Sequence, residues 1–136
     1  MATLDEIKEA LEAEDYIVEK VDERTLRILD RLVDGIEAIL VRTDTEILVQ
    51  TTLLPVSAVG DPAKVNERIL RTHKLIPLTT IAIEEVGGED CYIAFGSLAA
   101  ESRVEVVVKE VEFLYANLED IAELLVEEEL SEEKEA

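Results

Sequence analysis

The 136-residue chain holds little of what covalent chemistry uses: one cysteine (Cys91), one histidine (His73) and no tryptophan. A single cysteine cannot form an internal disulfide, and it cannot build a zinc site of several thiolates. No apolar run approaches the ~18 residues that a membrane-spanning helix needs. The sequence therefore excludes a disulfide scaffold, and we expect no direct insertion into a membrane.

Basic residues are also scarce. Thirteen Lys and Arg stand against 33 Asp and Glu, which gives a formal net charge of −20. A polyanion repels the phosphates of nucleic acids and the surfaces of anionic lipids, so we expect no nucleic-acid partner. A basic or amphipathic protein partner remains compatible with this charge. Plain solubility, or an acidic proteome, explains the charge equally well.

Apolar residues are present in ordinary amount, at 48% of the chain, against the ~45–50% of globular proteins. This length fits one domain, which we place at residues 1–126. Residues 127–136 are almost all acidic and predict a frayed or disordered tail. The N-terminus lacks a basic region followed by an apolar one, so we expect no secretory signal and a cytoplasmic location.

Three helices are indicated by their start signals. Thr3 and Glu6 have the spacing of a capping box, and this first helix should end near Asp15. The dipeptide 61–62 joins an aspartate cap to a proline at the first helical position, which predicts a second helix to about residue 75.

Ser102 and Glu105 predict a third capping box and a long C-terminal helix. Its apolar residues alternate steps of four and three, as in a heptad seam, and three more residues widen the stripe. A stripe this wide is more typical of a helix that packs on a sheet. The seam comprises Val104, Val108, Val111, Tyr115, Leu118, Ala122 and Leu125, widened by Val107, Leu114 and Ile121.

Strand patterns fill the remaining chain. Residues 16–18 predict a first strand and residues 26–28 a second. The second is ambiguous, because apolar residues in this region also fit a helical period: Leu26, Leu29, Leu32, Val33 and Ile36. Residues 36–42 and 46–54 flank a tight turn at 43–45 and predict a hairpin. Residues 80–86 and 90–95 predict another hairpin around Gly87-Gly88, since two glycines supply the positive φ angles of a two-residue turn.

Alternation along the first hairpin divides its side chains between two faces. One face should be a core face, formed by Ile36, Ala38, Leu40, Ile47, Val49 and Leu53. The other face mixes apolar and polar residues and is too apolar to lie wholly in water, so something should cover it: Ile39, Val41, Leu48 and Leu54 with Glu37, Glu46 and Gln50.

The predicted fold class is α+β. We expect a single domain in the order helix, antiparallel three- or four-stranded meander, helix, β-hairpin and long C-terminal helix.

No catalytic, cofactor-binding or metal-binding constellation is apparent. His73 has no signalled partner, and carboxylates beside Cys91 should raise the pKa of its thiol. Ser97 lacks the flanking glycines of a nucleophile elbow and is interpreted as part of a strand-to-helix turn. Weak divalent-cation binding at residues 127–129 would be unspecific. An enzyme of unrecognised type would need a pocket around His73, Cys91 and Tyr92.

A basic stripe is the most unusual local feature. Lys64, Arg68 and Arg71 recur at helical spacing, and His73 follows in the last turn of the same predicted helix. The stripe either pairs with acidic side chains of this chain, such as Glu67, or forms a docking face for an acidic partner segment. These four residues are the candidate partner-binding residues, and His73 also has a purely structural interpretation.

Three segments carry a family resemblance. Residues 66–74, 77–81 and 95–98 are similar to the bacterial YjfI family, a domain of unknown function, and the hairpin at 38–55 also resembles it. The resemblance covers most of residues 1–125. It carries no catalytic residues and implies a role near PspA-like envelope-stress proteins, which are coiled-coil membrane remodellers.

The order of elements also looks like that of class I type III secretion chaperones and YbjN-type proteins. That likeness implies a homodimer that holds a partner polypeptide on its surface. Three hypotheses follow: an adaptor or regulator of a PspA-like protein, a chaperone-like binder of an extended polypeptide, and an enzyme of unrecognised type.

Overall fold

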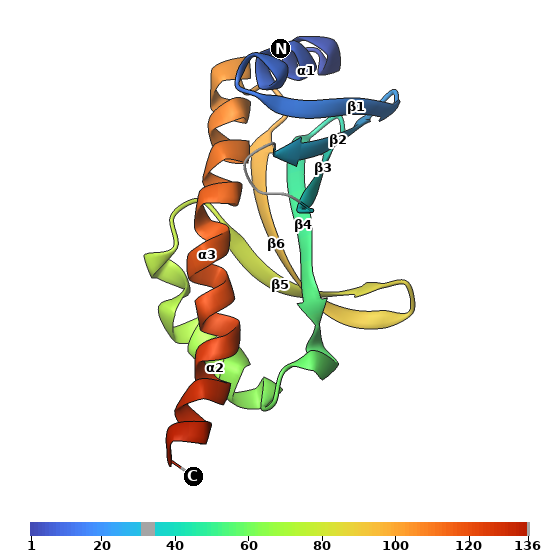
Figure 1. Cartoon of the computed structure of the whole chain (residues 1–136). Helices are drawn as coiled ribbons and strands as arrows, with labels where there is room; N and C mark the ends of the chain where they lie inside the picture. The colour runs from blue at the N-terminus through green and yellow to red at the C-terminus, as the bar shows by residue number, and fades with distance from the viewer. Residues whose placement is uncertain (31–34, 136) are drawn as a thin grey trace.

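The computed structural model describes residues 1–30 and 35–135, with side chains up to residue 126 (Figure 1). The helices are α1 (Leu4–Ala13), α2 (Pro62–Thr72) and α3 (Val104–Glu135), with two 3-10 turns, η1 (Val56–Ala58) and η2 (His73–Leu75). The strands are β1 (Tyr16–Asp22), β2 (Thr25–Asp30), β3 (Glu37–Arg42), β4 (Glu46–Pro55), β5 (Thr80–Val86) and β6 (Glu89–Ala99). Residues 26–28 are therefore a strand, while Leu32 and Val33 of the competing helical pattern lie outside the described residues.

The six strands form one antiparallel sheet in the order β1-β2-β3-β4-β6-β5. The predicted meander has four strands, and the second hairpin joins it because β6 pairs with β4. This arrangement confirms the predicted α+β class. It leaves β1 and β5 as the two edge strands.

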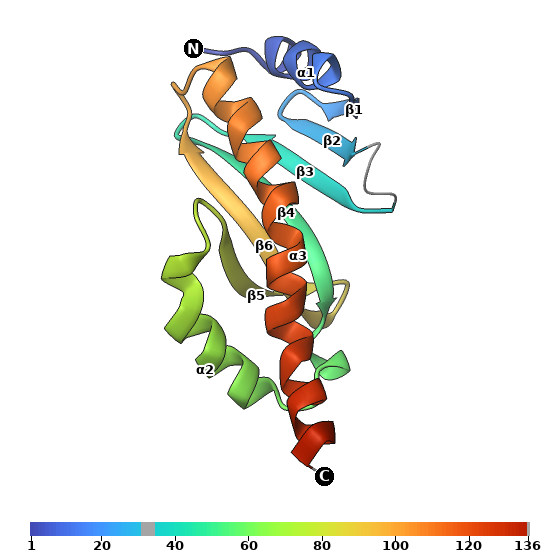
Figure 2. The same cartoon turned by 60° about the vertical axis from the view of Figure 1, so that its left-hand side comes forward.

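All three helices lie on one side of the sheet (Figures 1 and 2). The buried side chains of β1–β4 alternate along each strand and point toward these helices, as Leu26, Leu40 and Val49 do with no exposed surface. We call this side the helix face. The opposite side, which carries Ile39 and Val41, is called the open face, since no helix within the described residues covers it.

Helix starts follow the sequence signals at two of three places. Thr3 and Glu6 form the predicted capping box, with backbone-to-side-chain distances of 3.2 and 3.1 Å. The Asp61 carboxylate accepts a hydrogen bond from the Lys64 N–H at 3.2 Å. The capping box at Ser102 was a wrong prediction: α3 begins at Val104, and the carbonyl of Arg103 accepts its first backbone hydrogen bonds.

A β-bulge in β4 overturns another prediction. The register with β6 shifts between Thr52 and Leu54, so that Leu54 pairs with Tyr92, which lies in the core. Paired residues of antiparallel strands share a face, which places Leu54 rather than Leu53 on the helix face. A bulge adds one residue to one strand and reverses the alternation beyond it.

Helix α3 packs its predicted stripe on the sheet and against α1 and α2. Val107, Leu114 and Ile121, predicted only to widen the seam, are fully or almost fully buried, whereas Ala122 of the seam is exposed. The Tyr115 hydroxyl donates to the carbonyl oxygens of Ile28 and Ile36 at 3.2 and 3.1 Å. The helix continues to Glu135 through the segment predicted to be frayed, and the domain boundary at residue 126 stays a prediction.

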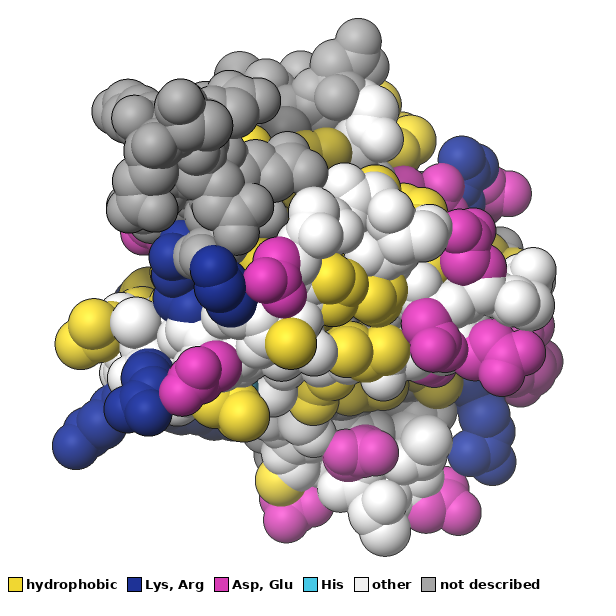
Figure 3. Space-filling view, turned by 90° about the horizontal axis from the view of Figure 1, so that it is seen from below, with side chains coloured by type: hydrophobic (Ala, Val, Ile, Leu, Met, Phe, Trp, Pro, Cys, Tyr) yellow, Lys and Arg dark blue, Asp and Glu magenta, His cyan; other side chains and the backbone are white. Residues whose placement is uncertain are grey.

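Charge is distributed unevenly over the lower part of the molecule. Figure 3 views it from below: hydrophobic side chains gather in the middle, Lys and Arg lie mostly toward the side of α2, and many Asp and Glu lie toward the side of the β5–β6 hairpin. The sequence explains this polarity. Helix α2 and η2 carry Lys64, Arg68, Arg71 and Lys74, and the hairpin carries Glu84, Glu85, Glu89 and Asp90.

Candidate functional site

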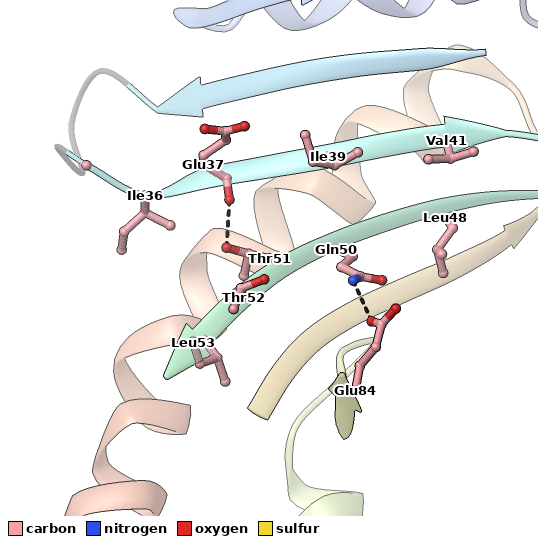
Figure 4. Close-up of a pocket in the computed structure, with 11 residues that line it drawn as sticks. Ile36, Glu37, Ile39, Val41, Leu48, Gln50, Thr51, Thr52, Leu53 and Glu84 are labelled. Carbon is pink, nitrogen blue, oxygen red and sulfur yellow. Dashed lines mark hydrogen bonds between the residues drawn. The ribbon is translucent and has the colours of Figure 1, made fainter. Parts of the chain in front are cut away.

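A hollow of about 670 Å³ lies on the open face, where strands β3 and β4 separate (Figure 4). The β3–β4 pairing extends only from Arg42–Ile47 to Ile39–Gln50, whereas β4 continues along β6 as far as Pro55. A notch therefore opens between the start of β3 and the end of β4. The hollow is lined by Gly35, Ile36, Glu37, Ile39, Val41, Leu48, Gln50, Thr51, Thr52, Leu53 and Glu84.

The floor of this hollow is aliphatic. Ile39, Val41 and Leu48 stand on adjacent strands, and Val41 pairs directly with Leu48. Their side chains are half-buried, which matches the prediction that this face is too apolar for water alone. Apolar surface that no described part of the chain covers is a marker of a binding surface.

Carboxylates border the floor on two sides. Arg27 of β2 bridges Glu37 at 2.8 Å and Glu19 at 3.4 Å, so its one positive charge faces two negative ones. These contacts raise the pKa of Arg27, the hydrogen bond with Glu37 most of all. On the other side, Gln50 donates to the carboxylate of Glu84 at 2.7 Å. The border of the hollow is therefore negative.

The bond between Gln50 and Glu84 also shapes the hollow. It joins β4 to β5 across the intervening strand β6, as the dashed line in Figure 4 shows. Beneath it, Ile93 of β6 is only 4% exposed although it lies on the open face. The curled β5–β6 hairpin thus forms one wall of the hollow.

The three groups suggested for an enzyme site do not converge. His73 accepts a hydrogen bond at Nε2 from the backbone N–H of Ile81, at 3.1 Å. Cys91 and Tyr92 are consecutive in β6, so their side chains point to opposite faces of the sheet. The Tyr92 hydroxyl donates to Asn66 Oδ1 at 2.6 Å, which ties β6 to α2. The imidazole of His73 and the hydroxyl of Tyr92 are therefore both used to hold the fold together.

Cys91 is buried, as predicted. Burial is the first cause of its raised pKa, and Glu89 and Asp90 raise the pKa further. A thiol with a raised pKa is a poor nucleophile at neutral pH. Its Sγ lies 3.7 Å from the carbonyl oxygen of Glu89.

Ser97 lies within β6 and not in the predicted strand-to-helix turn, because β6 continues to Ala99. Its hydroxyl donates to the carboxylate of Glu46 at 2.7 Å.

The basic stripe is in part internally paired. Arg71 bridges Glu67 one helical turn away at 2.9 Å. Lys64 and Arg68 line the same shallow surface hollow as Arg71. The assignment of Lys64, Arg68, Arg71 and His73 to partner binding stays a proposal.

Sequence reasoning missed one buried carboxylate. Glu110 of α3 is 5% exposed and packs against Gly96 of β6, where a Cβ atom would collide with the Glu110 carboxylate. Burial raises the pKa of Glu110. The sequence did offer a signal for this contact, because a glycine interrupts the apolar pattern of β6. Glycine within a strand often marks a place where another group approaches the backbone closely.

Two general features bear on the kind of site. Among the described residues, no three His, Cys, Asp or Glu side chains are placed to hold a metal ion together. No helix in the described part of the chain is both long and apolar enough to cross a membrane.

The geometry defines a single-domain α+β protein with helices on one face of its sheet and an apolar, acid-bordered hollow on the other. Residues 2–128 match the family described as an uncharacterized protein conserved in bacteria (DUF2170), and the chain belongs to that family. Escherichia coli YjfI, described as an uncharacterized protein, is 34% identical over 85 residues. That match spans 62% of this chain and 64% of the relative, so the chain matches less than two thirds of the relative's length.

Solved structures share the fold. YbjN of E. coli superimposes with a TM-score of 0.65 at 15% identity, over 96% of this chain and 94% of YbjN. A chain of the ExoU–SpcU complex of the Pseudomonas aeruginosa type III secretion system gives 0.61 at 16% identity, over 88% and 97%. A chain of the HopA1–SchA chaperone–effector complex gives 0.57 at 19% identity, over 88% and 87%. The chaperone-like fold expected from the sequence is thereby confirmed.

Proposed function

We propose that the chain is a cytoplasmic protein-interaction module that binds a polypeptide on the open face of its sheet and catalyses no reaction. The observation that carries the proposal is the hollow between β3 and β4, with Ile39, Val41 and Leu48 on its floor and Glu37 and Glu84 at its border. Side chains that could act in catalysis are used elsewhere: His73 holds β5, and the Cys91 thiol is buried with a raised pKa.

The partner proposed is a helical protein of PspA type, for which this chain would act as adaptor or regulator in envelope stress. The resemblance to the YjfI family suggests that class of partner. A helix with one apolar and one basic face suits the hollow, because its apolar side chains would cover the floor while its lysines meet Glu37 and Glu84. A homodimer is part of the proposal, as the likeness to secretion chaperones suggests.

The test is co-purification and calorimetric titration with a purified PspA-like protein. Binding should weaken strongly with salt, because charge attraction is screened over ~10 Å at 0.1 M salt. Leu48→Gln should reduce the affinity about tenfold or more by making the floor polar. The matched control is Val106→Gln on α3, where an exposed valine lies away from the hollow. Equal affinity of both variants would refute the open face as the binding site.

An extended polypeptide is the second candidate ligand. It is favoured by the chaperone–effector complexes among the structures of the same fold and by the notch beside β4, where backbone could approach the sheet. A peptide array would distinguish the candidates. Extended apolar segments that bind without any tendency to form helix favour this second function, whereas binding only of amphipathic helical segments favours the first.

A further inference from the structure

Two carboxylates border the hollow on the open face, and they differ in the group that holds them. Glu37 of β3 pairs with Arg27 Nε at 2.8 Å, so a positive charge already faces it. Glu84 of β5 accepts a hydrogen bond from Gln50 Nε2 at 2.7 Å, and an amide carries no charge. Within the described part of the chain, Glu84 forms no ion pair. Of the two carboxylates, Glu84 is therefore the one whose charge is uncompensated.

The hydrogen bond from Gln50 also fixes the position of the Glu84 carboxylate. It spans β6 and holds this carboxylate at the border of the hollow (Figure 4). The bond occupies Oε2, and Oε1 has no hydrogen-bond donor among the residues that the structure describes. A side chain that is held in place before a ligand arrives loses less entropy on binding. Glu84 thus offers a free and oriented acceptor beside an apolar floor.

Positive charge on the open face lies on the opposite side of the hollow. Three Lys or Arg side chains belong to the described strands. Lys20 forms an ion pair with α1, and Arg42 pairs with the core residue Ile47, so both lie on the helix face. The third is Arg27 of β2, and the strand order places β3, β4 and β6 between it and Glu84. The charge of the open face therefore changes sign along a direction that crosses the strands.

We propose that Glu84 determines which charge the bound polypeptide must carry: an amphipathic helix lies across the strands and places one Lys or Arg against Glu84. The inference rests on the proposed binding of a polypeptide to the open face, and it adds where the ligand carries its cation. A ligand cation beside Glu37 would gain less, because Arg27 already pairs with that carboxylate and would repel a second cation. The two borders of the hollow thus favour one orientation of the ligand.

The spacing of the strands sets the length of the ligand. Glu37 and Glu84 belong to strands that are three positions apart in the sheet. A strand-to-strand distance of about 4.8 Å places these strands roughly 14 Å apart. A helix rises about 1.5 Å per residue, so about nine or ten residues bridge the two borders. An extended segment would cover the same span in about four residues, so the position of the cation distinguishes a helical ligand from an extended one.

The experiment measures, by fluorescence anisotropy, the binding of two stapled helical peptides of about ten residues. Both peptides carry the same apolar stripe, and they differ at one end residue, which is lysine in one and glutamate in the other. The wild-type chain should bind the lysine peptide roughly tenfold or more tightly, because the glutamate peptide places two carboxylates together. A third peptide, with its lysine at the centre, should lose most of this preference.

Glu84→Lys should reverse the preference, and the reversal itself shows that the variant is folded. Glu85→Lys is the matched control and should keep the wild-type preference. It makes the same change of charge at the next residue of β5, whose side chain points to the other face. Gln50→Leu should reduce the preference severalfold, since the carboxylate of Glu84 then loses the group that orients it.

Three results would each overturn this inference: equal affinity of the wild type for the two end-labelled peptides, a full preference for the central lysine, or a preference that Glu84→Lys leaves unchanged. If Leu48→Gln still weakens the binding of both peptides in such a case, the open face remains the proposed binding surface. Binding that Leu48→Gln does not affect, or binding of neither peptide, would overturn the open face as well.

Discussion

Glu110 is a buried acid that the structure holds against the backbone of Gly96. Burial favours its neutral form, so its folded-state pKa lies above that of the unfolded chain. A group whose pKa is raised by folding contributes stability at pH values below the pKa that it has in the unfolded chain. That contribution is lost as the pH rises through the pKa that it has in the folded protein. The burial of Glu110 therefore costs stability at neutral pH relative to acid pH.

The first prediction concerns Glu110→Gln. The variant should raise the free energy of unfolding at neutral pH by about 1 kcal/mol, because an amide has no charge to desolvate. The gain should disappear below about pH 4, where glutamate is protonated in the unfolded chain as well. Denaturant unfolding across this pH range measures it. Glu119→Gln, on the exposed side of the same helix, should show no such pH-dependent gain.

The second prediction concerns Gly96→Ala. The added Cβ would collide with the Glu110 carboxylate, and overpacking at a buried position costs about 1–3 kcal/mol. Chemical denaturation of Gly96→Ala, Glu110→Ala and the double variant should show that the second substitution relieves part of the cost of the first. Strict additivity would mean that the two residues do not interact.

Among the elements, the β5–β6 turn was the most predictable. Gly87 and Gly88 have φ angles of 61° and 83°, as a two-residue hairpin turn requires. No atom lies within 4 Å of a Cβ added at either position, so a substitution there tests backbone conformation alone.

Gly88→Ala should therefore lower the free energy of unfolding by about 1–2 kcal/mol, the cost of a side chain in the left-handed region. Thermal unfolding followed by circular dichroism measures the change. Gly88→Asn is the matched control and should lose less, since asparagine tolerates this conformation. A loss for asparagine equal to that for alanine would contradict the backbone explanation.

Other elements show where local patterns stop being informative. The caps at Thr3 and Asp61 and the strand alternation in β3 depend on near neighbours, and the sequence predicts them. The bulge at Leu53 depends on the register with β6, whose paired residues lie some forty positions later in the chain. The capping box predicted at Ser102 does not form because β6 continues to Ala99 and α3 begins only at Val104.

The candidate site was predictable only in part. Alternation identified Ile39, Val41 and Leu48 as an apolar second face, which the structure confirms. The notch itself was not predictable, because it arises where β3 ends its pairing with β4 while β4 continues along β6. The Gln50–Glu84 bond spans 34 positions and has no local signal.

For the whole molecule, the net charge of −20 makes self-repulsion a general destabilising force. Added sodium chloride should raise the melting temperature at pH 7, because salt screens repulsion among exposed carboxylates. The increase should shrink near pH 4.2, the isoelectric point of the sequence. Scanning calorimetry at two salt concentrations and both pH values measures this, and a salt effect of equal size at both would contradict the explanation.

For the molecule as a whole, we propose that the open face of the sheet is the functional surface. Hydrogen exchange of the chain, with and without a purified PspA-like protein, measures whether the partner binds there. A partner bound on the open face should slow exchange in β3 and β4 around the hollow and leave α1 unchanged. Protection confined to the helix face, or none at concentrations where the two proteins co-purify, would contradict it.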